Sequence, residues 1–389
     1  MAEAYLSRGV SPTKEDVHAA IKEQPRGVFE DTFCKVTEDI LGDQDYCTIM
    51  HADGAGTKAI IAYLYYKETG DASVFKGIAY DSIVMNTDDM LCAGAYDNFV
   101  VSNTIGRNAH RIPGEILKQL IDGYAQFQAG METYDIRMIM AGGETADVGD
   151  LVSTVVVDST VFTRLRKDRV IRTSNIQPGD VIIGLASFGQ AVYEESYNSG
   201  IASNGFTAAR HILLSDRYAD AYPETYSSTL DKSKIYSGKY NLTDKLPGSD
   251  QTIGEALLSP TRTYLPVIKE VLEQDGLTVT GLIHCTGGGQ GKCKGFGKGL
   301  HYIKDQLFPV PPIFQAIQEQ GQIPLKEMYQ IFNMGHRMEI YCRREDAGQI
   351  IQIAAKYGVD ARQIGHVVAS SSEMNRVTIT TADHQTIEL

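Results

Sequence analysis

The chain has 389 residues, a formal net charge of −13, 43% hydrophobic residues and 22% charged residues. This length predicts two domains, and the composition is that of a folded globular protein rather than a disordered one. Because basic side chains are needed to release the counterions of nucleic-acid phosphates, the acidic balance argues against nucleic acid as a partner. An anionic small molecule is not excluded, since a metal ion can invert the local charge of an acidic pocket.

Neither the amino terminus nor any later segment looks like a membrane signal. No apolar region typical of a secretory signal follows Met1, and no run of about 18 apolar residues occurs. The six cysteines are scattered without a C-x-x-C pair, which indicates reduced, mostly buried thiols. We therefore expect a cytoplasmic protein with no membrane partner.

Strands and helices alternate through the first half of the chain. The hydrophobic periodicity predicts a strand over 47–53, a helix over 76–95, a strand over 98–104, a helix from 114 to about 130, a short apolar strand over 136–140 and a strand rich in β-branched residues over 151–163. A basic segment over 164–172 then leads into the turn-rich stretch 173–180, which is typical of a domain boundary. We expect one domain over 1–172 and a second over 173–389.

The second half contains fewer clear helices. The pattern predicts a strand over 181–186, helices after 205 and over about 260–274, a strand over 278–284, a strand over 337–342, a helix near 345–357 and closing strands over 362–369 and 376–381. Residues 216–250 are polar and rich in tyrosine, and we expect them to form a long surface excursion rather than core.

The first predicted strand ends in side chains suited to phosphate and metal. They are Asp53, Gly54, Gly56, Thr57 and Lys58. A carboxylate can ligate Mg²⁺, glycines let the backbone approach an anion, and a lysine can neutralise a transferring phosphate. The spacing is not that of a Walker A loop, and an ordinary strand–turn–helix junction is the alternative.

Acidic residues recur at two further places in the first half. Asp81 and Asp88 are seven residues apart, nearly one face of the helix over 76–95, and Asp89 follows directly. Acids on the inward side of a helix need a cation or a donor, whereas on a solvated face they need neither. Glu144, after Gly142 and Gly143, follows a short strand, where ligand sites of α/β folds gather. A glycine turn with a solvated glutamate is the alternative there.

Three segments of the second half could bind anions. His284 precedes the loop Thr286, Gly287, Gly288 and Gly289, whose backbone N–H groups are open to an anion. Ser203, Asn204 and Gly205 precede one helix, and Arg262 lies at the start of another. A structural histidine and simple helix capping explain these residues equally well.

The order of these signals resembles one family. The motifs are D-G-A-G-T-K at 53–58, D-x-x-x-x-G-A at 89–95, G-G-E-T-A at 142–146, S-N-G at 203–205, L-S-P-T-R at 258–262, T-G-G-G at 286–289 and M-Y-x-I-F-N-M-G at 328–335. Together they resemble the phosphoribosylformylglycinamidine cyclo-ligase (aminoimidazole ribonucleotide synthetase, PurM) family of purine biosynthesis, from about residue 47 to the carboxyl end.

The resemblance implies a fold and a reaction. The fold would be an N-terminal α/β domain, whose strands pair with those of a second subunit in a barrel-like homodimer core, followed by a C-terminal α+β domain. The reaction would be ATP- and Mg²⁺-dependent ring closure of formylglycinamidine ribonucleotide through phosphorylation of its formyl amide oxygen. Positioning and charge neutralisation would then be the main tasks of the protein.

The resemblance also implies roles for individual residues. The expected catalytic residues are Lys58, Glu144 and His284. The expected nucleotide-binding residues are Gly54, Gly56, Thr57, Lys58, Asp89, Gly142 and Gly143. The expected substrate-binding residues are Ser203, Asn204, Gly205, Arg262, Thr286, Gly287 and Gly288. The expected metal ligands are Asp53, Asp88, Asp89 and Glu144.

Several positions depart from the family pattern. Asp88 stands where the family usually has Asn, and Ala202 stands where its P-H-S-N-G loop has histidine. The G-G-E-T-A motif continues with Asp147 rather than M-P-G, and about a dozen extra residues occur near 190–200. Two alternatives therefore stay open: another ATP-dependent phosphoryl-transfer enzyme of the same superfamily, and a catalytically silent nucleotide-binding paralogue.

Overall fold

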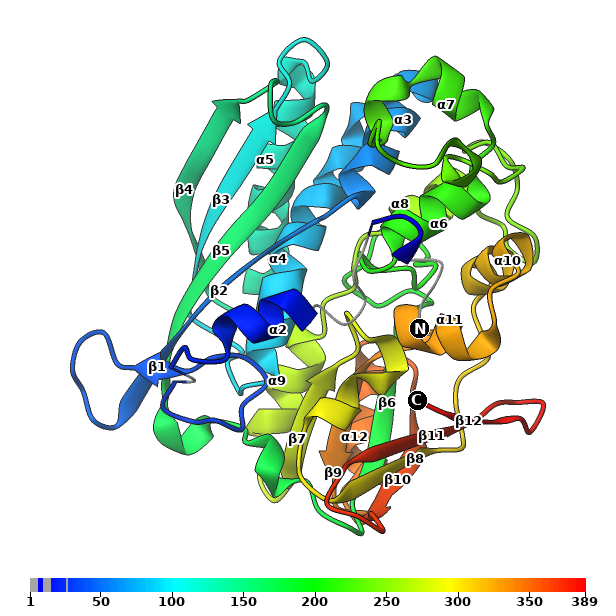
Figure 1. Ribbon diagram of the computed structural model, residues 1–389. Coiled ribbons are helices and arrows are strands. Elements are labelled where there is room, and N and C mark those ends of the chain that lie inside the picture. Colours follow the sequence, from blue (N-terminus) through cyan, green and yellow to red (C-terminus); the bar gives the residue numbers. More distant parts are fainter. Residues whose placement is uncertain (1–5, 10–14, 26) are drawn as a thin grey trace.

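The computed structural model describes residues 6–9, 15–25 and 27–389, which form two layered units side by side (Figure 1). Up to Arg166 the elements are α2 (Glu15–Ile21), β1 (Thr37–Glu38), β2 (Tyr46–Gly54), α3 (Lys58–Thr69), α4 (Phe75–Leu91), β3 (Phe99–Arg107), α5 (Gly114–Glu132), β4 (Met138–Asp147) and β5 (Val155–Arg166). After it come β6 (Val181–Ala186), α6 (Phe206–Leu213), α7 (Arg217–Ala221), α8 (Ile253–Leu258), α9 (Leu265–Glu273), β7 (Val279–His284), β8 (Leu300–Lys304), α10 (Pro312–Gly321), α11 (Leu325–Ile331), β9 (His336–Cys342), α12 (Ala347–Lys356), β10 (Ala361–Ala369), β11 (Arg376–Thr380) and β12 (Thr386–Glu388). Short 3₁₀ turns are η1 (Ala72–Val74), η2 (Lys167–Arg169), η3 (Thr173–Asn175), η4 (Pro223–Thr225), η5 (Lys232–Lys234) and η6 (Gly289–Gly295).

Each unit is built on one sheet. The N-terminal sheet has the order β1-β2-β5-β3-β4, and the C-terminal sheet has the order β12-β11-β8-β10-β6-β9-β7. Neighbouring strands are antiparallel except in the pairs β3–β4 and β8–β11, which are parallel. Two mixed sheets covered by helices confirm the predicted α/β and α+β fold class.

The two faces of the N-terminal sheet differ. Along β5 the buried residues alternate with more exposed ones, and the buried face packs against α4. On the opposite face, which Figure 1 shows without a covering helix, Met50 is 69% exposed and Ile139 is 44% exposed. Strict alternation of this kind is expected of a sheet with one covered face.

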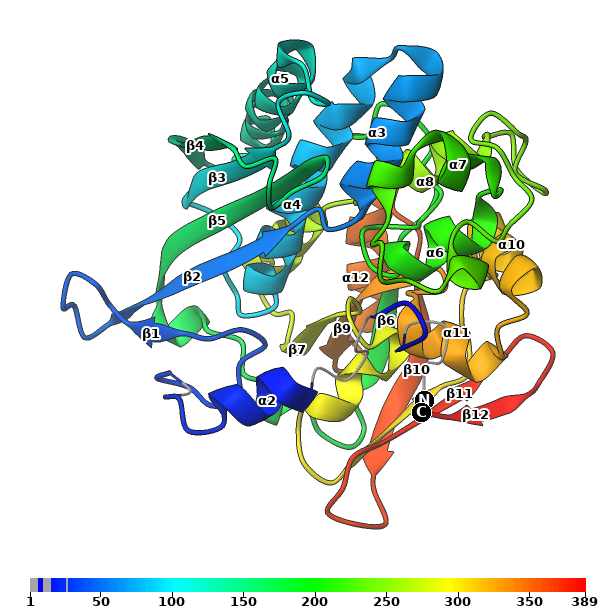
Figure 2. The same cartoon turned by 45° about the horizontal axis from the view of Figure 1, so that its top comes forward.

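Helix α4 lies between the two units, where Figure 2 shows it next to the N-terminal sheet and above β7. It contacts β2 and β5 on one side and α9 and β7 on the other. Most of its residues are buried for this reason, polar ones included. The predicted helix over 76–95 is therefore confirmed, although it ends at Leu91, before Gly94 takes a φ of +97°.

The G-G-E-T-A motif lies inside a strand, not after one. We predicted a strand over 136–140 followed by a turn, but β4 runs from Met138 to Asp147. Two residues of β4 face one residue of β3 between Met140 and Gly143, and Gly142 there has a φ of +89°. A glycine in this conformation lets a bulge replace the turn, because the strand continues beyond it.

The expected surface excursion over 216–250 is wrong in part. Tyr218, Tyr236 and Leu242 are all 0% exposed. The Tyr236 ring packs against Tyr218 and His211, and its hydroxyl accepts a hydrogen bond from Arg210. The tyrosines that made the segment look polar form a small core of their own, since each buries a ring while its hydroxyl finds a partner.

Candidate functional site

Two acidic side chains of α4 lie in the interior between the two units. Asp81 and Asp88 are both 0% exposed. Asp81 is paired with Lys58 and Asp88 with Arg337. The sequence argument that inward acids need a cation or a donor is therefore met by two basic side chains of the protein itself.

Lys58 joins three motif segments. Its Nζ donates to Asp81 Oδ1 at 2.9 Å, to the carbonyl oxygen of Ala202 at 3.1 Å and to that of Ser259 at 2.6 Å. Asp81 Oδ1 also accepts from the backbone N–H and the hydroxyl of Thr261, at 2.7 and 2.6 Å. The D-G-A-G-T-K, S-N-G and L-S-P-T-R segments thus converge on one buried ion pair.

The surroundings of Lys58 shift its pKa and occupy all of its hydrogen-bond donors. Its side chain is 0% exposed, and burial lowers its pKa although the charge of Asp81 opposes this. An ammonium group has three donors, and all three are used by the acceptors named above. In this arrangement Lys58 holds the segments together, and its expected contact with a transferring phosphate would need one of these bonds to open.

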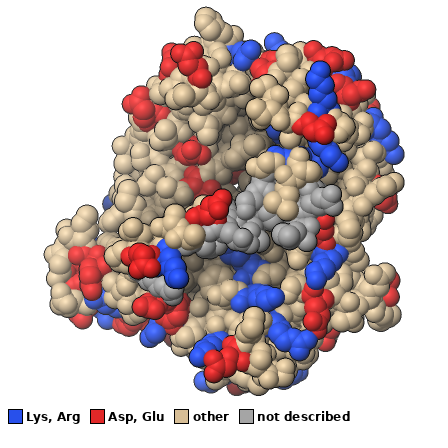
Figure 3. All heavy atoms as spheres, in the orientation of Figure 1, with Lys and Arg blue, Asp and Glu red and all other residues tan. Residues whose placement is uncertain are grey.

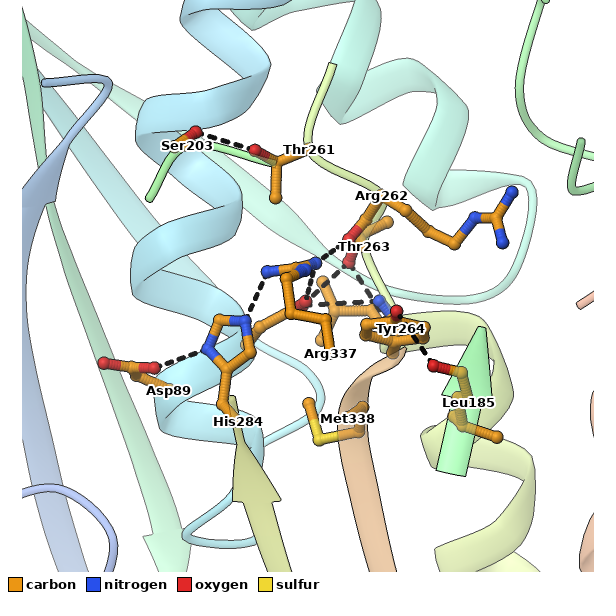
Figure 4. A network of polar contacts seen from close by, with 12 residues as sticks. Asp89, Leu185, Ser203, Thr261, Arg262, Thr263, Tyr264, His284, Arg337 and Met338 are labelled. Atoms are coloured by element: carbon orange, nitrogen blue, oxygen red, sulfur yellow. Dashed lines mark hydrogen bonds and ion pairs between the residues drawn. The ribbon is translucent and has the colours of Figure 1, made fainter. Parts of the chain in front are cut away.

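Arg337, on β9, is the basic partner of Asp88 and was not predicted from the sequence. Its Nη2 donates to Asp88 Oδ2 at 3.1 Å and to the carbonyl oxygen of Arg262, and its Nη1 contacts His284 Nε2 (Figure 4). Asp88 Oδ1 accepts from the Thr263 hydroxyl at 3.1 Å. Both carboxylate oxygens of Asp88 therefore already face protein donors, which leaves its expected role as a metal ligand without an open position.

His284 and Asp89 bring the two units together at the end of α4. His284 Nδ1 lies 2.6 Å from Asp89 Oδ1, and His51 Nε2 lies 3.5 Å from Asp89 Oδ2. Burial and the charge of Arg337 lower the pKa of His284. Burial alone would raise the pKa of Asp89, but the hydrogen bond from His284 acts in the opposite direction, and that pKa lies below its ordinary value. Asp89 is thus an ionised carboxylate between two imidazoles.

The loop after His284 presents backbone to solvent. Thr286 is buried and Gly287 is exposed, while Gly288 and Gly289 have φ values of +95° and +52°. A Cβ at Gly289 would lie 2.4 Å from the carbonyl oxygen of Tyr329. Only glycine fits this turn, which opens η6, and the Gly289 N–H donates back to the carbonyl oxygen of Thr286 at 2.9 Å.

A buried ionic cluster supports the loop from behind. Lys304 Nζ donates to the carbonyl oxygen of Gln290 at 2.7 Å and pairs with Glu339. Among the residues that the structure describes, Cys285, His336 and Glu339 form one group close enough to hold a metal ion. Because Lys304 already neutralises Glu339 and lowers the pKa of that carboxyl against the effect of burial, to about 2, the group is an ion-pair cluster here.

The acids at the strand ends are accessible. Asp53 and Asp158 lie on the neighbouring strands β2 and β5 and are exposed, and Figure 3 shows acidic side chains inside a hollow on one face of the molecule. Burial and the charge of Asp53 raise the pKa of Asp158, which the sequence had not singled out. A Cβ at Gly54 would lie 1.7 Å from Asp158 Oδ1, so the glycine makes room for this carboxylate.

Two of the acids carry ligand atoms suited to a hard divalent cation. Asp53 and Asp89 offer oxygen donors, the ligand type that Mg²⁺ prefers. Asp158 lies opposite Gly54 rather than Asp53, so its side chain projects from the other face of the sheet. His51 connects the two groups, because it lies on β2 two residues before Asp53 and contacts Asp89.

Glu144 does not join this group. In the register of the sheet, Gly54 faces Asp158, Asp158 faces Thr104 and Thr104 faces Glu144. Three strand spacings separate Gly54 from Glu144, which amounts to about 14 Å. Within one chain Glu144 therefore cannot ligate the same ion as Asp53, contrary to the shared role that we expected, and Gly142 and Gly143 lie at the same distant edge of the sheet.

Arg262 is occupied by a residue of the extra segment near 190–200. Its guanidinium pairs with Glu194 through Nε at 2.9 Å and through Nη2 at 2.5 Å, and Nη1 donates to the carbonyl oxygens of Ala186 and Phe188. Arg262 is 3% exposed. Arg262, which we expected to bind an anion, is therefore paired with a carboxylate of the protein itself. The sequence could not reveal this pair, because it does not show where the extra segment lies in the fold.

The S-N-G segment lies beside Arg262 on the same interface. The Ser203 hydroxyl is 2.7 Å from that of Thr261, and Gly205 takes a φ of +86° at the start of α6. The Oδ1 atom of Asn204 is buried and has no hydrogen-bond partner among the described residues. A buried carbonyl oxygen without a donor is a position where a ligand donor would be favourable.

No helix among the described residues is long and apolar enough to cross a membrane.

Comparison with known proteins covers most of the chain. The N- and C-terminal domains described as AIR synthase related protein match residues 34–164 and 177–375. Phosphoribosylformylglycinamidine cyclo-ligase of Methanocaldococcus jannaschii is 32% identical over 84% of this chain and 79% of its own length, and the protein of that name from Methanococcus maripaludis strain C7 is 30% identical over 96% of both. Thermotoga maritima PurL complexed with FGAR has the same fold, with a TM-score of 0.58 at 15% identity, and this chain covers 51% of that one and is itself covered completely. The chain belongs to the AIR synthase related family.

Proposed function

We propose that this protein is the cyclo-ligase that converts formylglycinamidine ribonucleotide to aminoimidazole ribonucleotide with ATP. The relatives that match along most of both chains are named phosphoribosylformylglycinamidine cyclo-ligase, which supports the proposal. The single observation that carries it is the convergence of three motif segments on the Lys58–Asp81 pair, on the helix that also bears Asp89. The chain thus has the parts of a phosphate-handling enzyme assembled in one place.

The reaction balances as two displacements. The γ-phosphoryl group of ATP moves to the formyl amide oxygen, and ADP leaves. A nitrogen of the amidine side then attacks the activated formyl carbon, the new C–N bond closes the ring, and the oxygen leaves as phosphate with loss of a proton. No side chain needs to form a bond with the substrate, so positioning and charge neutralisation are the tasks of the protein.

Each part of the site then has a task. Asp53 and Asp89 would hold Mg²⁺, which when bound supplies positive charge to the phosphates of ATP. The backbone at Gly54, Gly56 and Thr57 would bind those phosphates. On the other side of the interface, the N–H groups of Gly287 and Gly288 and the segment at 203–205 would bind and orient the phosphorylated substrate.

The open face of the N-terminal sheet supports a homodimer. Met50 and Ile139 are exposed on a face that no helix of the described residues covers, and exposed apolar sheet faces of this kind mark interaction sites. A second copy of the chain offers the same face, and an isologous contact closes a dimer. In such a dimer Glu144, at the edge strand β4, would contribute beside the partner rather than beside Asp53 of its own chain.

We propose the division into domains 1–172 and 173–389, which the family matches on either side of 165–176 support. We also place the protein in the cytoplasm, where its six free thiols stay reduced.

A turnover assay tests the proposal. ADP release and aminoimidazole formation are measured with Mg²⁺-ATP, with and without formylglycinamidine ribonucleotide. We expect matched amounts of both products in wild type and a loss of about 10²–10³-fold in Asp53→Asn, because one site carboxylate is lost. Asp45 is an exposed acid directly before β2. Asp45→Asn therefore serves as the matched control and should keep wild-type turnover.

Each other outcome has a distinct meaning. ADP release that ignores the ribonucleotide would favour a different acceptor, and nucleotide binding without turnover would favour a silent paralogue. Wild-type turnover in Asp53→Asn would contradict the metal assignment alone.

A further inference from the structure

Arg337 has an unusual place for a charged side chain. It lies on β9, in the interior, and is 1% exposed. Its guanidinium contacts His284 Nε2, Asp88 Oδ2 and the carbonyl oxygen of Arg262, all within the interface between the two units (Figure 4). Burying an arginine costs hydration free energy, which its contacts in the protein must offset. The three contacts of Arg337 therefore need an explanation.

The contacts of Arg337 settle which nitrogen of His284 carries the proton. A guanidinium stays protonated in proteins and can only donate, so the His284 Nε2 that it contacts must be the acceptor. A neutral imidazole has one N–H, which is then on Nδ1, 2.6 Å from Asp89 Oδ1. The ring donates to Asp89 on one side and accepts from Arg337 on the other, and neither nitrogen remains for a substrate.

We propose that Arg337 is a positioning residue that locks His284 in the Nδ1–H tautomer and so commits Asp89 Oδ1 to His284, which makes Asp89 Oδ2, 3.5 Å from His51 Nε2, the oxygen that binds a cation. This inference rests on the proposed function, because it gives Asp89 its orientation toward the Mg²⁺ that the reaction uses. His284 then acts through Asp89 and is not itself a proton-transfer group, which differs from the catalytic role expected from the sequence. Asp88 is the counter-ion that keeps Arg337 in place.

Arg337 and His284 would orient Asp89 without binding the metal ion themselves. Metal-binding carboxylates are oriented by hydrogen bonds from groups behind them, and loss of such a group costs about 10–100-fold in metal affinity or activity. Here the support runs from β9 through His284 to α4, so it also ties the orientation of Asp89 to the docking of the C-terminal unit on α4.

The first test reads the tautomer directly. The full-length protein is labelled with ¹⁵N in its nine histidines, and the His284 ring signals are assigned by their loss in His284→Asn. We expect wild type to show Nδ1 protonated and Nε2 unprotonated. In Arg337→Met the ring should lose this fixed state, and Nε2–H should become populated. Arg210→Met removes another buried arginine of the same unit, 4% exposed, and should leave the His284 signals unchanged.

The second readout separates positioning from simple structural support. In Arg337→Met the Mg²⁺ concentration for half-maximal turnover should rise about 10–100-fold, while the KM for the ribonucleotide stays near wild type. If Arg337→Met does not fold, Arg337→Lys keeps a charge opposite Asp88 but lacks the second donor arm, and the same signals decide. A protonated Nε2 in wild type, or an unchanged tautomer in the folded variant, would overturn the proposal. The tautomer is read without substrate, so missing turnover in wild type would count against the proposed function only.

Discussion

The two sheets of the molecule differ in how far their strands are exposed to solvent. The N-terminal sheet packs one face against α4 and leaves the other uncovered, with Met50 69% and Ile139 44% exposed. In the C-terminal sheet the neighbouring strands β6 and β9 are buried along their whole length. One sheet therefore has an accessible side and accessible strand ends, and the other is enclosed at β6 and β9, although β8, β10, β11 and β12 carry more exposed residues.

This difference decides which polar groups each sheet can carry. The strand ends of the N-terminal sheet present Asp53 and Asp158 to solvent, where a cation can reach them. The C-terminal sheet encloses Glu339, Lys304 and Arg337, and each of these has a charged partner because none has water. The open sheet offers ligands, while the closed sheet fixes the groups at the interface.

The largest effect is expected when a charge of the closed sheet loses its partner. Glu339→Gln removes the negative charge opposite Lys304, and both side chains are 0% exposed. A buried lysine left without a counter-charge should cost about 3–5 kcal/mol of unfolding free energy, measured by urea denaturation. The matched change in the open sheet is Glu38→Gln, whose partner Lys167 lies at the surface, and it should cost less than about 1 kcal/mol. Equal costs for both variants would remove the distinction between the sheets.

A second change tests what covers the open face. Met50→Lys places a charge there, and we expect light scattering to report half the wild-type mass, because like charges then meet across a two-fold contact. The stability of the monomer should change by only about 0.5 kcal/mol, since the side chain is exposed. Met374→Lys, at a position 72% exposed in the C-terminal unit, is the control and should keep the wild-type mass. A wild-type protein that is already monomeric would contradict the homodimer.

A third prediction concerns the pH dependence of stability. Burial, with the charges of Arg210 and Arg8, lowers the pKa of His211 from 6.5 to about 2. The unfolded chain therefore binds a proton below pH 6.5 that the folded chain does not, and stability falls as the pH falls from 6.5 toward 2 by up to about 1.4 kcal/mol per unit for this group. His211→Gln should make the fall less steep in urea titrations between pH 6.5 and 4.5. His110→Gln, at an exposed position near the open sheet, should leave the slope as in wild type, and an unchanged slope in His211→Gln would show that another group is responsible.

Local patterns of sequence predicted the local structure well. The β-branched run predicted as a strand over 151–163 overlaps β5, which begins only at Val155, and the helical spacing over 114–130 lies in α5. Of the two positions left open for Asp81 and Asp88, the inward one is confirmed, since both are 0% exposed. The motif order identified the family because it records many local turns at once.

Partners across the fold could not be predicted in this way. Asp88 and Arg337 are 249 residues apart, so their pairing depends on how two sheets dock on one helix. The bulge at Gly142 shifted the register of β4, and Glu194 reached Arg262 from a segment that has no counterpart in the family motifs. Composition also led us to expect Tyr218 and Tyr236 at the surface. A tyrosine ring can be buried wherever its hydroxyl finds a hydrogen-bond partner, and composition does not show such partners.

The contacts across α4 also affect whether the two halves of the chain unfold together on heating. Residues up to 172 alone would leave Lys58 without two of its three acceptors, Ala202 and Ser259, and would leave Asp88 without Arg337. These contacts are lost when the halves separate, so the docking of the second half contributes to the stability of the first. We therefore expect both halves to unfold in one transition, which calorimetry would show as a single peak.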